Sequence, residues 1–314
     1  MIITARNPDM PAIPAELFTP ETADSLEMER ISREHHSAAY DGWIRLRKNK
    51  GALVCLDVLA LLTLFALIAP IISPYTYYQT DYMAKLKPPS AAHWLGTDLF
   101  GRDLWTRMWY GTRISLLIGL CAAAINIFIG VLYGAISALM GGVVDAVMQR
   151  TIEVLVGVPS LILVILFMMA LPPGIWTIIL ALSVTGWVQM ARLVRAQILR
   201  MKGMEFVLAA RLLGTGTWTM IRRHLIPNTV GVIIIQVMFA IPSAIFTEAF
   251  LSFIGIGLAE PQASLGVLIN NGYSVLRSSP YMLVYPAVTI VLLMVCFSIV
   301  GDGLRDAFDP RMKG

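Results

Sequence analysis

The residues of this chain best suited to chemistry are polar side chains inside long apolar runs. Glu248 is the clearest case, because apolar and aromatic residues flank it in the segment FTEAFLSF. An ionisable group at the centre of a membrane helix costs about 2.5 to 3.5 kcal/mol on insertion scales, so its presence needs a physical reason. Two reasons fit Glu248: it lines a pathway through the membrane, or it forms a buried hydrogen bond with another helix.

Three uncharged amides raise the same question in other apolar runs: Asn126, Gln189 and Gln236. Amide side chains often hold membrane helices together by hydrogen bonds, so packing and pathway lining both stay open for them. We take the three amides, with Glu248, as candidate pathway-lining residues.

The chain shows no pattern typical of an enzyme. It has no GxxxxGK[ST] phosphate loop, so we expect no ATP site of the P-loop kind. Its histidines follow no metal-ligand spacing and are scattered over the tail and loops: His35, His36, His93 and His224. Each cysteine lies in an apolar run, without a CxxC pair. We therefore expect no catalytic residue, metal site or cofactor in this chain.

Composition indicates the elements that must position these residues. Of the 314 residues, 57% are hydrophobic and only 14% are charged, against about 25% charged in a soluble domain. The apolar residues gather in runs of about 20, the length that crosses a bilayer as a helix. We predict an all-α membrane protein with six transmembrane helices, at residues 51–72, 114–140, 146–171, 174–198, 229–256 and 281–301.

The charges indicate the orientation. Most Lys and Arg residues near the span ends fall on the side of the N-terminus, which the positive-inside rule places in the cytoplasm. Both termini are then cytoplasmic. The formal charge of +4 fits this distribution, so it does not call for nucleic acid. Residues 1–50 are polar, so we interpret the first apolar run as an uncleaved span.

The segments between the spans suggest further domains. We expect a partly flexible cytoplasmic tail at 1–50, with a surface helix possible from Ala23 to Lys50, and a cytoplasmic tail at 302–314. An external loop at 73–113 is expected to end in a short interfacial helix, because aromatic rings favour the membrane surface. The core domain covers 114–301, and its external segment 257–280 contains glycines and prolines typical of turns.

Small residues recur every fourth position in the second predicted span, at Gly130, Gly134, Ala138 and Gly142. This spacing lets the backbone of another helix approach closely. We interpret the row as a helix-packing surface.

Residues 203–228 form the most informative loop. Glu205 begins a helical pattern that Gly214 ends, and a second short helix is expected from Thr217 to Leu225, ended by Pro227. Two helices joined through glycine can bind as a unit in a groove of a partner. An ordinary basic cytoplasmic loop explains the same residues.

The loop sequence GMEFVLAARLLGTGTWTMIRRHLIPN resembles the loop by which permease subunits of bacterial ABC importers contact their ATPases. The family pattern is Glu-Ala-Ala, three residues, Gly, nine residues, then Ile-x-Leu-Pro. Ala209, Ala210 and Gly214 match it, and Pro227 lies at the expected distance. Leu208 takes the place of the family's Glu, with the acid at Glu205, and His224 takes the place of Ile. The resemblance implies an ATPase-coupling loop containing Glu205, Ala209, Ala210, Gly214, His224 and Pro227.

Three other segments resemble the peptide and nickel importer group, closest to the C subunits of oligopeptide and dipeptide permeases. They are WLGTDLFGRDLWTRMWYGTRISL, LSFIGIGLAEPQASLG and GDGLRDAFDPR, and the likeness covers about residues 45–314. It implies the type I importer permease fold in a bacterial cytoplasmic membrane and ATP-driven import of peptides by alternating access. Oligopeptides are the first expectation, and dipeptides or nickel complexes are alternatives.

The implied partners are a second homologous permease subunit, two ABC ATPase subunits that bind ATP and Mg, and an external peptide-binding protein. An ion-coupled secondary transporter is the alternative, but it would show inverted repeats with matching broken spans in both halves. A membrane scaffold without transport is a third interpretation, which the ATPase-type loop and Glu248 disfavour.

Overall fold

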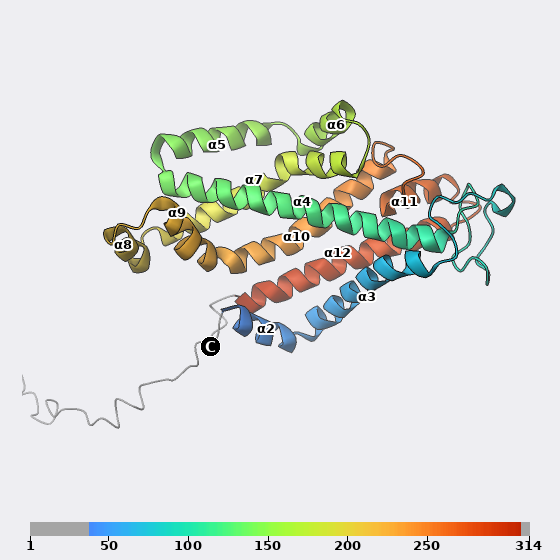
Figure 1. Ribbon diagram of the computed structural model, residues 1–314, viewed down its shortest axis with the longest axis horizontal. Coiled ribbons are helices and arrows are strands. Elements are labelled where there is room, and N and C mark those ends of the chain that lie inside the picture. The colour runs from blue at the N-terminus through green and yellow to red at the C-terminus, as the bar shows by residue number, and fades with distance from the viewer. Residues whose placement is uncertain (1–37, 309–314) are drawn as a thin grey trace, which may run out of the picture. The chain divides into compact units, whose positions relative to one another are not determined.

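The structure, a computed structural model, describes residues 38–308, with side chains from residue 43 onward. The predictions for residues 1–37 and 309–314 lie outside this range. The described chain is almost entirely helical (Figure 1). Its α-helices are α2 (Ala38–Lys48), α3 (Lys50–Ile72), α4 (Leu104–Met140), α5 (Gly142–Gly157), α6 (Ser160–Ala170), α7 (Ile175–Met201), α8 (Glu205–Leu212), α9 (Thr217–Met220), α10 (Ile226–Phe253), α11 (Leu265–Ser274) and α12 (Tyr281–Phe308).

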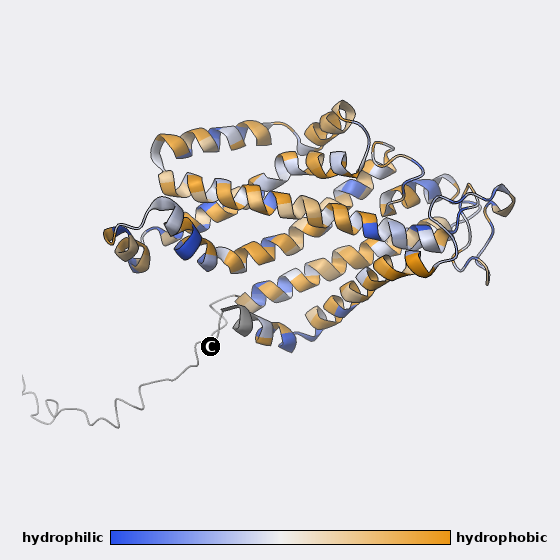
Figure 2. Cartoon of the chain, in the orientation of Figure 1, coloured by the Kyte–Doolittle hydropathy of each residue, from blue (hydrophilic) through white to orange (hydrophobic). Residues whose placement is uncertain are grey.

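Five stretches of this range are long and apolar enough to span a membrane, and there are six if the bent pair of α5 and α6 counts as one span. The five are α3, α4, α7, α12 and the continuous stretch Thr217–Phe253. Their surfaces are mostly hydrophobic, and polar residues gather in the loops beyond the helix ends (Figure 2). The prediction of an all-α membrane protein is confirmed.

The third predicted span, 146–171, is wrong as one continuous helix. The structure divides it into α5 and α6, which meet at an angle of 82°. The break falls at Pro159, which favours it, because proline lacks a backbone N–H and disfavours helical geometry in the preceding residue. Val158 is accordingly extended, with φ −98° and ψ 131°.

The second predicted span, 114–140, begins earlier than predicted, at Leu104 of α4. Asp103 caps α4 by accepting the N–H of Thr106 at 2.8 Å, so the helix starts at Leu104, and it continues unbroken for 37 residues. Residues 104–113 are therefore the first turns of this helix and not a separate interfacial helix. Trp109, in these turns, stacks on Phe65 of α3 with ring centroids 5.0 Å apart.

The second helix expected in the 203–228 loop does not end at Pro227. A π-helical turn, Ile221–Leu225, joins α9 to α10, and Pro227 lies in the first turn of α10. The N–H of Ile226 donates to the carbonyl of Ile221, five residues earlier. Proline fits at this position because N–H groups of a first turn have no partner within their own helix. The span consequently runs from Thr217 rather than from residue 229.

Two glycines expected to mark turns in 257–280 lie inside α11 instead. A Cβ on Gly266 would come within 2.5 Å of the Ala249 carbonyl oxygen, and one on Gly272 within 2.6 Å of the Leu283 nitrogen. These glycines let α11 pack tightly against α10 and α12.

The glycine row of α4 packs as predicted over part of its length. A Cβ on Gly130 would lie 2.6 Å from the Met190 Cβ, and one on Gly134 would lie 2.3 Å from the Ala191 carbonyl oxygen. The backbones of α4 and α7 are thus in close contact there. Gly142 does not take part, because it begins α5 and has no atom near its Cβ position.

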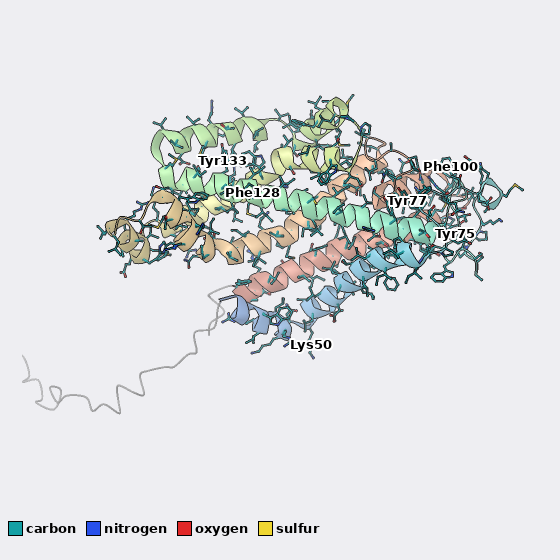
Figure 3. All side chains as sticks on the ribbon, viewed as in Figure 1. Lys50, Tyr75, Tyr77, Phe100, Phe128 and Tyr133 are labelled. Carbon is teal, nitrogen blue, oxygen red and sulfur yellow. The ribbon has the colours of Figure 1, made fainter. Side chains whose placement is uncertain are left out.

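The two ends of the bundle carry different structures. Tyr75, Tyr77 and Phe100 lie near α11, whereas Lys50 lies at the opposite end of α3 (Figure 3). We call the end that carries α11 the α11 end, and the opposite end, which carries α8, the α8 end (Figure 1). Leu46 and Ala307 share a buried cluster, so α2 packs against the end of α12.

Candidate functional site

The loop at the α8 end is held by a few buried side chains and presents an apolar surface. Val207 and Ala210 of α8 are buried in a cluster with residues of α4 and α7. Leu212 and Leu213, at the end of the helix, are 89% and 86% exposed. Large exposed apolar side chains grouped in this way are typical of a protein-binding surface.

Gly214 closes α8 in a conformation that favours glycine, with φ +76°. Its N–H donates to the Arg211 carbonyl at 2.9 Å, and the N–H of Thr215 donates to the Ala210 carbonyl at 3.0 Å. These bonds satisfy carbonyls at the end of the helix and fix the direction of the chain toward α9.

The six predicted coupling residues do not share one environment. Ala210 is buried and serves as a contact that holds α8 in place, and His224 is half-buried within the π turn. The other four are exposed: Glu205, Ala209, Gly214 and Pro227.

A cavity of about 1020 Å³, open on one side, lies between α5, α6, α7 and α10. The predicted residues Asn126, Gln189 and Gln236 all line it. Hydroxyl groups from Thr185, Ser243 and Thr247 line it as well, and sequence reasoning did not identify them. The three amides from three different helices are thus brought to one space.

Asn126 has an unusual place in the cavity wall. A Cβ on Gly186 of α7 would lie 2.3 Å from its Nδ2, so the amide fits only because residue 186 is glycine. Asn126 is 9% exposed, and its Oδ1 has no hydrogen-bond partner. This oxygen is itself buried and unpaired, which is an exception, because a buried carbonyl oxygen normally has a partner.

Glu248 does not line the cavity. It is fully buried, and its two carboxylate oxygens accept hydrogen bonds at 2.8 Å from Ser115 of α4 and from Ser252 of α10. Ser115 in turn accepts the N–H of Leu265 at 3.2 Å, which joins α11 to the group. This arrangement favours the interpretation of Glu248 as a buried hydrogen-bond acceptor.

A cluster of four charged residues lies at the α11 end. Asp98 accepts from Arg102 Nε at 2.6 Å, and Glu260 accepts from both terminal nitrogens of Arg102. Arg107 is fully buried beside the two carboxylates, with Nη2 3.4 Å from Glu260 Oε2. The cluster joins the segment before α4 to the segment before α11.

The charge cluster shifts the ionisation of its members. Burial alone would raise the pKa of Glu260, but the hydrogen bond from Arg102, the charge of Arg107 and the Asn271 amide hold it below its ordinary value. Burial lowers the pKa of Arg102, but its bonds and charge pairing with Glu260 and Asp98 raise it overall.

Helix α5, which forms one wall of the cavity, is attached mainly by polar contacts. Ile152 is its one buried residue. Asp145 accepts two hydrogen bonds from Arg195 of α7, at 2.7 and 2.5 Å, and a further one from Ser137 of α4. This bidentate ion pair fixes α5 to both neighbouring helices.

Residues 127–314 match the family described as the inner membrane component of binding-protein-dependent transport systems. The chain belongs to this family. Residues 37–89 match a second family model, the N-terminal transmembrane domain of oligopeptide transport permease C. The chain is therefore a multi-pass permease of the inner membrane.

Two relatives from Bacillus subtilis match this permease over nearly its whole length. It is 44% identical to the oligopeptide transport system permease protein OppC, over 97% of this chain and 100% of the relative. It is 46% identical to the dipeptide transport system permease protein DppC, over 96% and 94%. Family membership excludes the ion-coupled transporter considered above.

A solved structure supports the fold. The permease resembles a chain of the MetNI methionine ABC transporter in an inward-facing conformation, with a TM-score of 0.52 and 18% identity over 64% of this chain and 97% of the other. The permease has the type I ABC importer fold.

Sequence reasoning missed two parts of the site. Arg192 lines the cavity on the same face of α7 as Gln189, three residues earlier. From the sequence alone it is explained as one of the positive charges that lie near span ends on the cytoplasmic side. The four-charge cluster falls within the segments GTDLFGRDLWTR and LAEPQ, which were used only to identify the family. Charged residues recur four or five residues apart in the first of these segments, and this spacing is the sequence signal that could have predicted the cluster.

Proposed function

We propose that this permease is the transmembrane subunit of an ABC importer that moves peptides, oligopeptides foremost, across the cytoplasmic membrane. The observation that carries the proposal is the match, over nearly full length, to relatives named as oligopeptide and dipeptide permeases. Transport proceeds by alternating access and is driven by ATP hydrolysis on partner subunits, which hold the ATP and Mg. The permease itself has no catalytic role.

The α8 end is the proposed contact with the ATPases, and it faces the cytoplasm together with both termini. Leu212 and Leu213 extend from a helix that buried side chains hold in place. A movement of the ATPase surface against these residues would displace α8 as a unit, together with the adjoining ends of α7 and α10.

The cavity is the proposed share of this subunit in the translocation pathway. It is open on one side, so a second homologous permease subunit supplies the opposite wall. Two ABC ATPases and an external peptide-binding protein complete the importer.

Dipeptides are the second candidate substrate. The identity to the dipeptide permease, 46%, is as high as the identity to the oligopeptide permease, 44%, so overall similarity favours neither length. Nickel complexes have less support, because the cavity walls described here contain no Asp, Glu, His or Cys.

Two proline substitutions test the coupling role of the α8 loop. Gly214→Pro is incompatible with φ +76° and removes the N–H that bonds Arg211, so the turn after α8 cannot form. Gly216→Pro is the matched control, because Gly216 has φ −66° and open space at its Cβ position. Both are made in the assembled complex in proteoliposomes.

We expect the Gly214→Pro complex to assemble but to lose most of the ATPase stimulation by peptide-loaded binding protein. The Gly216→Pro complex should respond as the wild type does. Normal stimulation of an assembled Gly214→Pro complex would disprove the coupling role. Absence of ATP-dependent peptide uptake by the wild-type complex would disprove the transport function itself.

A further inference from the structure

Arg192 is the one charged residue among the described residues that line the cavity. It is exposed to this space, and it makes no ion pair with any residue of the described chain. Arg195, on the same helix, shows the contrast, since its Nε and Nη2 both donate to the carboxylate of Asp145 on α5. The guanidinium group of Arg192 is therefore free to bind a carboxylate through two hydrogen bonds.

Amide groups lie beside this guanidinium on two helices. Gln189 precedes Arg192 by one turn of α7. The amide of Asn126 packs against Gly186, one further turn back on α7. Gln236 lines the cavity from α10.

Amide side chains carry both a donor and an acceptor, which is the pattern of a peptide group. Gln189 and Gln236 both line the cavity with side chains that are exposed or half-buried, so they can pair with main-chain amides. Such contacts hold a peptide without regard to its side chains. The wall described here holds no carboxylate, so it offers no partner for an N-terminal ammonium group.

We propose that Arg192, Gln189 and Gln236 form a binding subsite for the C-terminal end of a peptide. Arg192 binds the terminal carboxylate, and Gln189 and Gln236 bind the adjoining main-chain groups. The inference rests on the proposed function, and it adds an orientation: the carboxylate lies nearer the α8 end and the rest of the peptide extends toward the α11 end.

The test compares one peptide with its C-terminal amide in proteoliposomes that contain the complete transporter. Uptake per transporter is measured with binding protein saturated by each peptide, so that selection by the binding protein does not enter. The wild type should transport the free acid about tenfold faster than the amide, as expected for one hydrogen bond to a charged group.

Three variants of α7 separate the subsite from general effects. Arg192→Gln should transport both peptides at nearly equal rates, and Arg192→Lys should retain part of the preference. Arg200→Gln is the matched control, because Arg200 is an exposed arginine of the same helix that does not line the cavity. It should keep the wild-type ratio.

A fourth variant tests the amides. Gln236→Leu should lower the uptake of both peptides by a similar factor, because it removes a main-chain contact and leaves Arg192 in place. An acid-to-amide ratio that is near one in the wild type, or that survives Arg192→Gln, would overturn the subsite while uptake of peptide still supports the transport function. Failure of all peptide uptake in the wild type would overturn both.

Discussion

At the residue scale, both side-chain oxygens of Glu248 accept hydrogen bonds within the protein. Its two oxygens accept from hydroxyl groups on α4 and on its own helix, and Ser115 extends the contact to the backbone of α11. A buried carboxylate held in this way joins three helices at one point. Its importance is therefore structural in the conformation described here.

Glu248→Ala should destabilise the purified complex, by about 1–3 kcal/mol, because it leaves the hydroxyl groups of Ser115 and Ser252 buried without an acceptor. Glu248→Gln retains an acceptor oxygen and should cost less. Thermal unfolding in detergent measures both, with Glu153→Gln, a change at an exposed carboxylate, as the control. Equal stability of Glu248→Ala and the control would contradict the role of Glu248 as a joint between helices.

At the element scale, α5 is the wall of the cavity with the weakest apolar attachment. One buried residue, Ile152, the contacts of Asp145 and two hydrogen bonds to α4, from Tyr133 to the Met148 carbonyl and from Gln149 to Ser137, hold it against α4 and α7. Gly141 and Gly142, both at positive φ, precede it, and the bend at Pro159 follows it. The position of this helix should thus depend on the Asp145–Arg195 ion pair.

Reversing the ion pair tests this dependence. Asp145→Arg and Arg195→Asp should each destabilise the complex, and the double reversal should recover part of the loss, with an interaction energy of about 1 kcal/mol or more in a double-mutant cycle. The pair Arg150–Glu153 on the same helix is the control, because both side chains are exposed and such pairs contribute little. Additive effects at Asp145 and Arg195 would show that the pair does not hold α5.

At the scale of the whole molecule, the four-charge cluster joins segments distant in the sequence at the α11 end. The pKa of Glu260 is held below its ordinary value in the folded protein, so its charge stabilises the fold above the ordinary carboxyl pKa. This stabilisation is lost as the pH falls through the lowered value. Acidification should therefore weaken the contact between the segments before α4 and α11.

Glu260→Gln should lower the thermal stability of the complex at pH 7. The difference from the wild type should narrow as the pH falls into the acidic range, because protonation then removes the same charge in the wild type. Unfolding curves at a series of pH values measure this. A difference that stays constant or widens on acidification would refute the role of the Glu260 charge.

Hydropathy was sufficient to predict the spans but not their breaks. Pro70, Pro242 and Pro286 lie within continuous helices, whereas Pro159 separates α5 from α6 at 82°. The residue type is the same in all four cases, so packing with neighbouring helices decides the outcome. Sequence patterns carry no direct information on that packing.

The candidate site was predictable in composition but not in arrangement. Three of the four polar residues line one cavity, and the fourth, Glu248, is directed into a helix junction. The faces that helices turn toward each other depend on contacts such as the one between Asn126 and Gly186, which are 60 residues apart. Arg192 was overlooked because a charge near a span end has an adequate explanation in membrane topology.

The unbroken length of α4 has a mechanical consequence. At 1.5 Å per residue its 37 residues extend about 55 Å, well beyond a hydrocarbon layer of about 30 Å. Arg107 in the charge cluster and Ser137 beside the α5 ion pair lie on this single rod. A tilt of the rod at one membrane surface moves its other end in the opposite sense, so loosening of the charge cluster and displacement of α5 are expected to occur as one lever motion.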